Sequence, residues 1–104
     1  MSLLDHVLFA GCTHEGAAEE ARRLVEITPE GLTRVFYSDN GSTAVEVALK
    51  MAFQYWQNQG DKNRKRFLAF EGAYHGDTVG AMSAGDPGEF GEPFRPLFFP
   101  VERI

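Results

Sequence analysis

The sequence predicts an α/β fold built on a parallel sheet. Segments with apolar residues at helical spacing alternate with short runs of β-branched and aromatic residues, which is typical of parallel strands joined by helices. Residues 34–50 carry the clearest signal, because an apolar run there passes into a helix through a polar turn that contains Gly41. With 104 residues, of which 43% are hydrophobic, the chain is long enough for one small domain.

The N-terminal third is expected to contain one helix and one strand. Thr13 is a favourable N-cap, and apolar side chains recur at helical spacing before Pro29, so we expect a helix over residues 14–27. Residues 33–38 are β-branched and aromatic, which predicts a buried strand.

A second helix is expected after the polar turn. Apolar residues again recur at helical spacing up to Gly60, with Glu46 and Lys50 as a supporting surface pair. A hydrophilic loop over residues 61–65 then leads to a strand over residues 66–70. The two strands and the helix between them are expected to form one right-handed βαβ unit.

The C-terminal third is expected to be rich in loops. Residues 71–77 form a loop after the second strand, and residues 78–84 predict a short helix. The glycine- and proline-rich stretch over residues 85–96 predicts a loop. A third strand is expected over residues 97–101, and Pro100 places it at a sheet edge or at its own end.

Composition excludes several classes of protein. Ten Lys and Arg residues oppose fifteen Asp and Glu residues, so the net charge is −5 and nucleic acid is not an expected partner. A single cysteine suits a reducing cytoplasm. No apolar run approaches the roughly 20 residues of a membrane span, so no membrane association is expected. The first residues lack the features of a signal peptide, and residues 1–3 resemble a remnant of cloning.

Two loops form the candidate site. In an open parallel sheet, ligands bind outside the carboxyl ends of the strands, and the loops over residues 38–43 and 71–77 leave such ends. Gly41 allows close approach of a phosphate, Ser42 and Thr43 carry hydroxyls, and the helix start supplies free N–H groups. We therefore expect the two loops to share one anionic ligand.

The second loop adds an aromatic face, a group that titrates near neutrality and a carboxylate, from Tyr74, His75 and Asp77. Together the loops suit a flat, charged, phosphorylated ring. Two simpler interpretations stay open at this point. The first is that Asp39 or Ser42 is an ordinary helix cap. The second is that Tyr74 is a half-buried aromatic residue of the loop.

Other chemistries fit the sequence poorly. A Walker-type phosphate loop needs a Gly-Lys pair, and a dinucleotide fingerprint needs three spaced glycines, whereas this turn has only Gly41. Cys12 and His14 need not face each other, so Cys12 is favoured as a small core residue over a nucleophile. Neither His14 nor the pair His75 and Asp77 has the spacing of metal ligands, so no metal is expected.

Three blocks of the sequence resemble the pyridoxal-phosphate-dependent class III aminotransferases. They are HVLFAG-C-THE (residues 6–15), FYSDNGSTAVEVALKMA (residues 36–52) and YHGDTVGAMS (residues 74–83). The likeness is closest to members that serve biotin synthesis with S-adenosylmethionine as amino donor. Members are several times longer, so the resemblance implies that residues 1–104 are a single partial domain. That domain would be part of the three-layer, parallel-sheet large domain of a fold type I enzyme.

The resemblance also implies roles for site residues. Gly41 and Ser42 would bind the phosphate of pyridoxal 5'-phosphate, and Tyr74 would stack on its pyridine ring. Asp77 would lie near the substrate end of the same loop, with His75 beside it. The family builds its active site at a homodimer interface, which implies a second copy as partner besides small-molecule substrates.

The lysines limit the chemistry of this chain. In the family, a lysine holds the cofactor as a Schiff base and an aspartate pairs with the ring nitrogen, and neither residue can be matched here. The only lysines are Lys50, Lys62 and Lys65, and none lies in a plausible Schiff-base position. The chain by itself is therefore expected to be inactive, to bind cofactor weakly at most, and to self-associate. The alternative is a non-catalytic α/β module for phosphate binding, cofactor binding or assembly.

Overall fold

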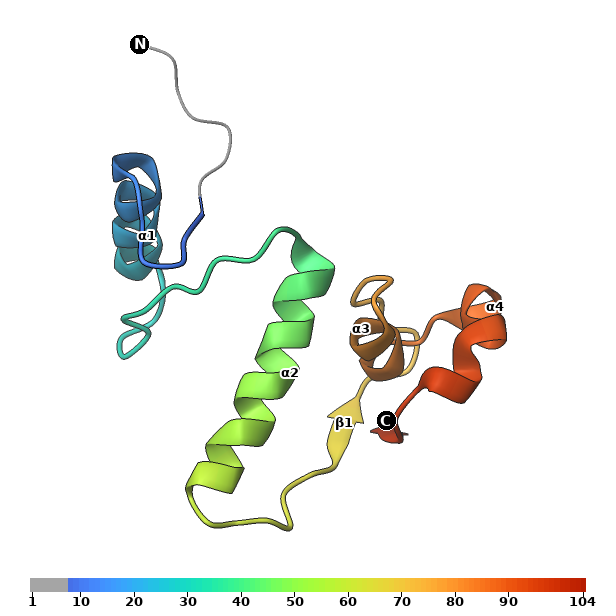
Figure 1. Ribbon diagram of the computed structural model, residues 1–104. Helices are drawn as coiled ribbons and strands as arrows, with labels where there is room; N and C mark the ends of the chain where they lie inside the picture. The colour runs from blue at the N-terminus through green and yellow to red at the C-terminus, as the bar shows by residue number, and fades with distance from the viewer. Residues whose placement is uncertain (1–7) are drawn as a thin grey trace. The chain divides into compact units, whose positions relative to one another are not determined.

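The computed structural model describes residues 8–104 (Figure 1). The expectation that residues 1–3 derive from cloning lies outside the described residues. The chain divides into two compact units, residues 1–36 and Tyr37–Ile104. No helix in the described range is both long and apolar enough to cross a bilayer.

The first unit contains α1 (Glu15–Ile27), which confirms the expected helix. Its N-cap is His14 and not Thr13 as predicted, because the His14 ring nitrogen Nδ1 accepts the Ala17 N–H at 3.2 Å. The same ring stacks on Phe9, with ring centroids 5.9 Å apart, so packing as well as capping fixes its place.

An ion-pair network lines the exposed face of α1. Glu19 bonds Arg22 at 2.8 Å and Arg23 at 2.7 Å, and these hydrogen bonds lower the pKa of Glu19 to about 2. The side chains are well solvated, so the pairs support the helix only weakly.

The predicted strand over residues 33–38 is wrong, because that segment has no strand conformation in the structure. A strand exists only through hydrogen bonds to a neighbour, and the described sheet consists of two other segments. The expected βαβ unit over residues 33–70 is therefore wrong as well. A β-branched, aromatic composition does not supply a pairing partner.

The second unit begins with α2 (Gly41–Asn58), the expected second helix. Its N-cap is Asn40, not Asp39 or Ser42. The Asn40 side chain accepts the Thr43 N–H at 3.0 Å, and the Thr43 hydroxyl accepts the Asn40 N–H at 3.1 Å. This reciprocal pair is a capping box, which fixes where the helix starts.

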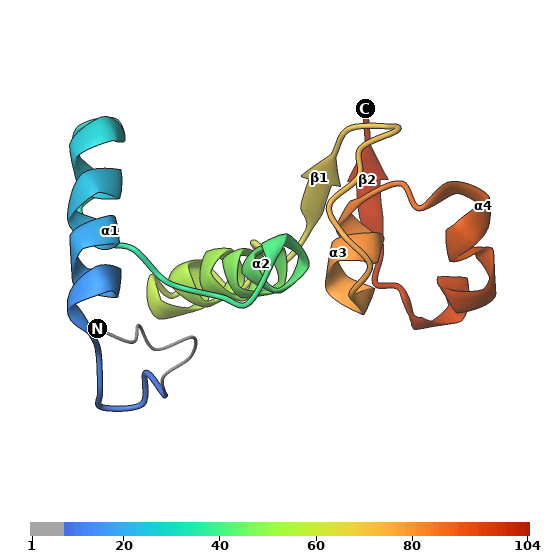
Figure 2. The same cartoon turned by 90° about the horizontal axis from the view of Figure 1, so that it is seen from above.

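The sheet is a parallel pair, β1 (Phe67–Ala69) and β2 (Val101–Arg103), as Figure 2 shows. Phe67 lies opposite Val101, and their register continues to the ends of both strands. The parallel arrangement and the strand within residues 66–70 are confirmed. The third strand was expected over residues 97–101, but it begins only at Val101. Pro100 directly precedes β2 and has no N–H to donate to a neighbouring strand.

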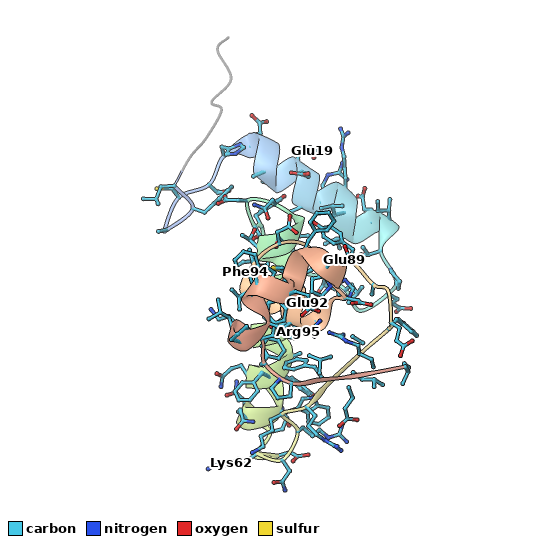
Figure 3. The ribbon with its side chains drawn as sticks, turned by 90° about the vertical axis from the view of Figure 1, so that its right-hand side faces the viewer. Glu19, Lys62, Glu89, Glu92, Phe94 and Arg95 are labelled. Carbon is cyan, nitrogen blue, oxygen red and sulfur yellow. The ribbon has the colours of Figure 1, made fainter. Side chains whose placement is uncertain are left out.

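Three short helices connect β1 to β2: α3 (Val79–Ala84), α4 (Gly88–Gly91) and the 3-10 helix η1 (Glu92–Leu97). The expected short helix is confirmed, whereas the expected loop over residues 85–96 is wrong. Pro93 lies in the first turn of η1, where an N–H group would have no partner inside the helix, so proline is tolerated there. Glu92 also pairs with Arg95 across that turn (Figure 3).

The small core of the second unit centres on α3. Gly80 to Ala84 are all buried there, and Ser83 is the largest side chain that is fully buried. In contrast, α2 has no buried residue, and Leu68 and Phe70 are 63% and 70% exposed. A large apolar surface of this unit therefore faces outward.

Candidate functional site

A hollow of about 650 Å³ lies where the start of α2 meets the loop before α3. This volume falls within the range of small-molecule sites. The residues that line it come from both predicted loops: Asn40, Gly41, Ser42, Val45, Tyr74, His75, Gly76, Asp77 and Thr78. The structure thus brings together every predicted site residue, Gly41, Ser42, Tyr74 and Asp77.

The reason for this proximity differs from the predicted one. The two loops were expected to leave the carboxyl ends of neighbouring strands, but residues 8–40 contain no strand before α2. Side-chain hydrogen bonds hold the loops together instead. The Ser42 hydroxyl donates to the Thr78 hydroxyl at 2.8 Å, and the Thr78 N–H donates to Ser42 Oγ at 2.9 Å.

The start of α2 offers backbone donors to the hollow. Helix geometry leaves the N–H groups of Gly41 and Ser42 without an acceptor inside the helix, and the helix dipole favours negative charge there. The third N–H, that of Thr43, is already used by Asn40. The Thr43 hydroxyl, expected to face the ligand, takes part in the capping box and accepts from the Ser38 hydroxyl at 2.7 Å.

Tyr74 and Asp77 form a pair on the opposite wall. The Tyr74 ring is 71% exposed, so its face is open to a ligand. Its hydroxyl donates to the Asp77 carboxylate, and this hydrogen bond raises the pKa of Tyr74 above its ordinary value. Asp77 therefore lies close to the Tyr74 hydroxyl, and Tyr74 itself stays exposed.

Gly76 is a site residue that the sequence reasoning missed. Its φ is +117°, a conformation that favours glycine, and a Cβ there would lie 2.5 Å from the Ser42 side chain. Only glycine lets this loop approach the helix start so closely. The available signal was a glycine between two polar residues of a candidate binding loop.

Glu46 was also missed, because its spacing to Lys50 suggested a surface pair. The half-buried Glu46 carboxylate instead accepts the N–H groups of Gly80 at 2.6 Å and Ala81 at 3.2 Å. The Thr78 hydroxyl also bonds to it, and this contact is the main cause of the lowered pKa of Glu46. The carboxylate supplies acceptors to the start of α3, because the side chain of the N-cap residue Thr78 does not cap that helix.

No lysine lines the hollow. Lys50 lies roughly 13 Å along the axis of α2 from Gly41 at the α-helical rise. Lys62 and Lys65 belong to the loop after the carboxyl end of α2, where Lys62 is labelled in Figure 3. Within this chain, the hollow can bind and orient a ligand but has no amine to attach it covalently.

The interpretation of Cys12 is wrong. Cys12, favoured as a small core residue, is exposed. Within residues 8–104, no three His, Cys, Asp or Glu side chains gather closely enough to hold a metal ion.

Comparisons with known proteins agree on one family. The family model for class-III aminotransferases matches residues 1–104. The chain is 64% identical over 99 residues to the adenosylmethionine-8-amino-7-oxononanoate aminotransferase of Synechococcus elongatus, covering 95% of this chain and 23% of that protein. The protein of the same name from Geobacter sulfurreducens is 55% identical over 98 residues, covering 94% of this chain and 22% of its own length.

Solved structures show the same likeness. The crystal structure of the adenosylmethionine-8-amino-7-oxononanoate aminotransferase from Methanocaldococcus jannaschii matches with a TM-score of 0.88 and 47% identity, over 94% of this chain and 22% of that one. A PLP-bound amine transaminase from an uncultivated Pseudomonas species matches with a TM-score of 0.83 and 36% identity, over 95% and 22%. The chain thus spans less than a quarter of the length of each of these relatives.

Proposed function

The chain belongs to the class-III aminotransferases, and from this premise we propose that it is a segment of a longer transaminase of biotin biosynthesis. The complete protein would transfer an amino group from S-adenosylmethionine to 8-amino-7-oxononanoate, which gives 7,8-diaminononanoate. The relatives that are 64% and 55% identical carry the name of that activity, which supports this choice of substrates.

The observation that carries the proposal is the hollow between the start of α2 and residues 74–78. A phosphorylated pyridine ring needs backbone donors at one end and an aromatic face beside the ring, and the hollow presents both. We therefore propose pyridoxal 5'-phosphate as the cofactor. When bound, it supplies an aldehyde carbon that takes up the amino group and a ring that withdraws electrons from it.

Each site residue has a proposed task. The N–H groups of Gly41 and Ser42 hold the phosphate at the positive end of the α2 dipole. Tyr74 covers one face of the ring, and Asp77 orients Tyr74 through its hydroxyl. The carboxylate of Asp77 also borders the open side of the hollow, where we place the substrate.

We propose that residues 1–104 form a single partial domain within the three-layer large domain of a fold type I enzyme. The exposed apolar side chains around β1 support this, since a larger sheet and a further helical layer would cover them. We further propose that the complete protein is a cytoplasmic homodimer, and that the isolated chain self-associates through its free strand edges and exposed apolar side chains.

By itself the chain is proposed to lack transaminase activity. Binding and orientation remain possible at the hollow, but no lysine reaches it to attach the cofactor. The same observation favours a second candidate function, a non-catalytic module that binds cofactor or phosphate.

The test is an assay of the complete protein that carries this segment, supplied with pyridoxal 5'-phosphate, S-adenosylmethionine and 8-amino-7-oxononanoate. We expect diaminononanoate to form and Tyr74→Ala to lower kcat/KM about 100-fold, since a ring-positioning contact is lost. If the protein bound the cofactor but transferred no amino group from S-adenosylmethionine, the proposed choice of substrates would be contradicted. Absence of cofactor uptake would contradict the site itself and favour the non-catalytic module.

A further inference from the structure

The connection between β1 and α3 carries Tyr74 in its middle and is anchored near both of its ends. Toward α3, Thr78 exchanges its two hydrogen bonds with Ser42. Toward β1, the Glu71 N–H donates to the Ile104 carbonyl at 3.0 Å. The backbone directly before Tyr74 lies between these anchors and is held by a third part of the chain.

Asp86 makes that third attachment. Its N–H donates to the Ala73 carbonyl at 2.5 Å, and its carboxylate accepts the Gly72 N–H at 3.1 Å, from 14 positions further along the sequence. The Ala73 carbonyl belongs to the peptide group that joins Ala73 to Tyr74. One residue therefore fixes the plane of the peptide from which Tyr74 projects, as well as the backbone two residues before it.

Gly85 makes this close approach possible. It is buried, and a Cβ there would lie 3.0 Å from the Ala73 carbonyl oxygen and 3.1 Å from the Ala81 carbonyl oxygen. The Gly85 N–H also donates to the Ala81 carbonyl at 2.8 Å at the end of α3. The lack of a side chain thus lets the end of α3 lie against the loop and brings Asp86 within reach of it.

The Asp86 side chain is itself oriented by its surroundings. While one carboxylate oxygen bonds Gly72, the other accepts the Gly88 N–H at 3.4 Å, a contact two residues along the chain that is typical of an Asx turn. Asp86 is exposed and is not among the residues that line the hollow. Its effect on a ligand in the hollow therefore has to pass through the loop.

We propose that Asp86 is a positioning residue that, through the backbone of Gly72 and Ala73, holds the Tyr74 ring where it stacks on the pyridine ring of the cofactor. This inference rests on the proposed cofactor site. A flat ring binds an aromatic face only at stacking separation, so freedom in the backbone before Tyr74 weakens that contact.

The proposal separates the two ends of the cofactor. The proposed phosphate donors, the N–H groups of Gly41 and Ser42, belong to α2, whose start is fixed by its own capping box. Asp86 makes no printed contact with that turn, so removing its carboxylate should affect the ring and spare the phosphate. General damage to the fold would weaken the binding of both.

The experiment is a double-mutant cycle in the complete protein, prepared without cofactor. The dissociation constants of pyridoxal 5'-phosphate and of inorganic phosphate are measured for Asp86→Ala, Tyr74→Ala and the double variant. We expect Asp86→Ala to weaken pyridoxal 5'-phosphate binding about fivefold and inorganic phosphate binding less than about twofold. In the Tyr74→Ala background, Asp86→Ala should add less than about twofold, because the ring that it positions is gone.

A spectroscopic measurement and two further variants complete the test. The visible circular dichroism of bound pyridoxal 5'-phosphate reports the asymmetric surroundings of its ring and should weaken in Asp86→Ala at saturating cofactor. Asp86→Asn keeps an acceptor oxygen and should restore binding to within about twofold of the unaltered protein. Glu89→Ala removes an exposed carboxylate three residues further along, on α4, and should change neither ligand (Figure 3).

The outcomes are distinguishable. Unaltered binding of pyridoxal 5'-phosphate in Asp86→Ala, equal weakening of both ligands, or an undiminished effect in the Tyr74→Ala background would overturn this inference and leave the proposed function standing. If the unaltered protein showed no saturable binding of pyridoxal 5'-phosphate, the proposed cofactor site would be refuted and this inference with it.

Discussion

Ser42 and Thr78 exchange two hydrogen bonds although they lie 36 positions apart in the sequence. One joins the two hydroxyls and the other runs from the Thr78 N–H to Ser42 Oγ. This pair connects the start of α2 to the loop before α3 and so creates the hollow between them.

Gly76 is expected to be intolerant of a side chain. Gly76→Ala would strain a residue with φ of +117° and press its Cβ against Ser42, at a cost of about 2–4 kcal/mol in the free energy of unfolding. Gly72→Ala is the matched control, because Gly72 has φ of +68° with nothing near its missing Cβ. Urea unfolding of both variants in the complete protein measures the difference, and equal losses would show that Ser42 is not in contact.

Asp77 is expected to control the ionisation of Tyr74. Since the hydrogen bond to Asp77 raises the pKa of Tyr74, Asp77→Ala should return it toward the ordinary value near 10. Tyrosine absorbance near 295 nm follows this titration when Tyr37 and Tyr55 are replaced by Phe. A Tyr74 titration that does not move in Asp77→Ala would refute the pairing.

The lowered pKa of Glu46 predicts a specific dependence of stability on pH. A carboxyl group whose folded pKa lies below its unfolded value near 4.5 stabilises the fold above that value, and the contribution is lost as pH falls through the folded pKa. Glu46→Gln should therefore lose stability at pH 7 and differ less from the unaltered protein in acid. Thermal unfolding from pH 3 to pH 7 measures this, with Glu89→Gln as control. Parallel curves for Glu46→Gln and the unaltered protein would contradict the assignment.

The isolated chain is expected to self-associate through the free edge of β1. Leu68 is 63% exposed on this short strand, so Leu68→Lys should lower the average mass in sedimentation experiments over a range of concentrations. Phe90→Lys is the control, because Phe90 is 91% exposed on α4, away from the sheet. An equal effect of both variants would indicate nonspecific hydrophobic contact, and a monomer at all concentrations would contradict the prediction.

The sequence predicted the helices better than it predicted which segments pair as strands. Helical periodicity located α1, α2 and α3, because the repeat of apolar residues is set within each segment. The strand expected over residues 33–38 failed because a strand depends on a neighbour that local sequence does not specify. The same limit applies to the loop expected over residues 85–96, where prolines at tolerated positions allowed short helical turns.

In the candidate site too, some residues could be predicted from the local sequence and others could not. Gly41, Ser42, Tyr74 and Asp77 could be chosen from their chemistry, and they line one hollow. Glu46 and Thr78 could not, because their importance arises from contacts between α2 and the start of α3. The spacing of Glu46 to Lys50 even suggested a different role.

The central claim is that this chain forms part of a cofactor site without the lysine that would attach the cofactor. The most direct measurement is reduction with sodium borohydride after incubation with pyridoxal 5'-phosphate, followed by peptide mapping of the 104-residue chain. We predict no stoichiometric label on Lys50, Lys62 or Lys65 and no amino transfer from S-adenosylmethionine. One of these lysines labelled stoichiometrically, together with turnover by the chain alone, would contradict the account.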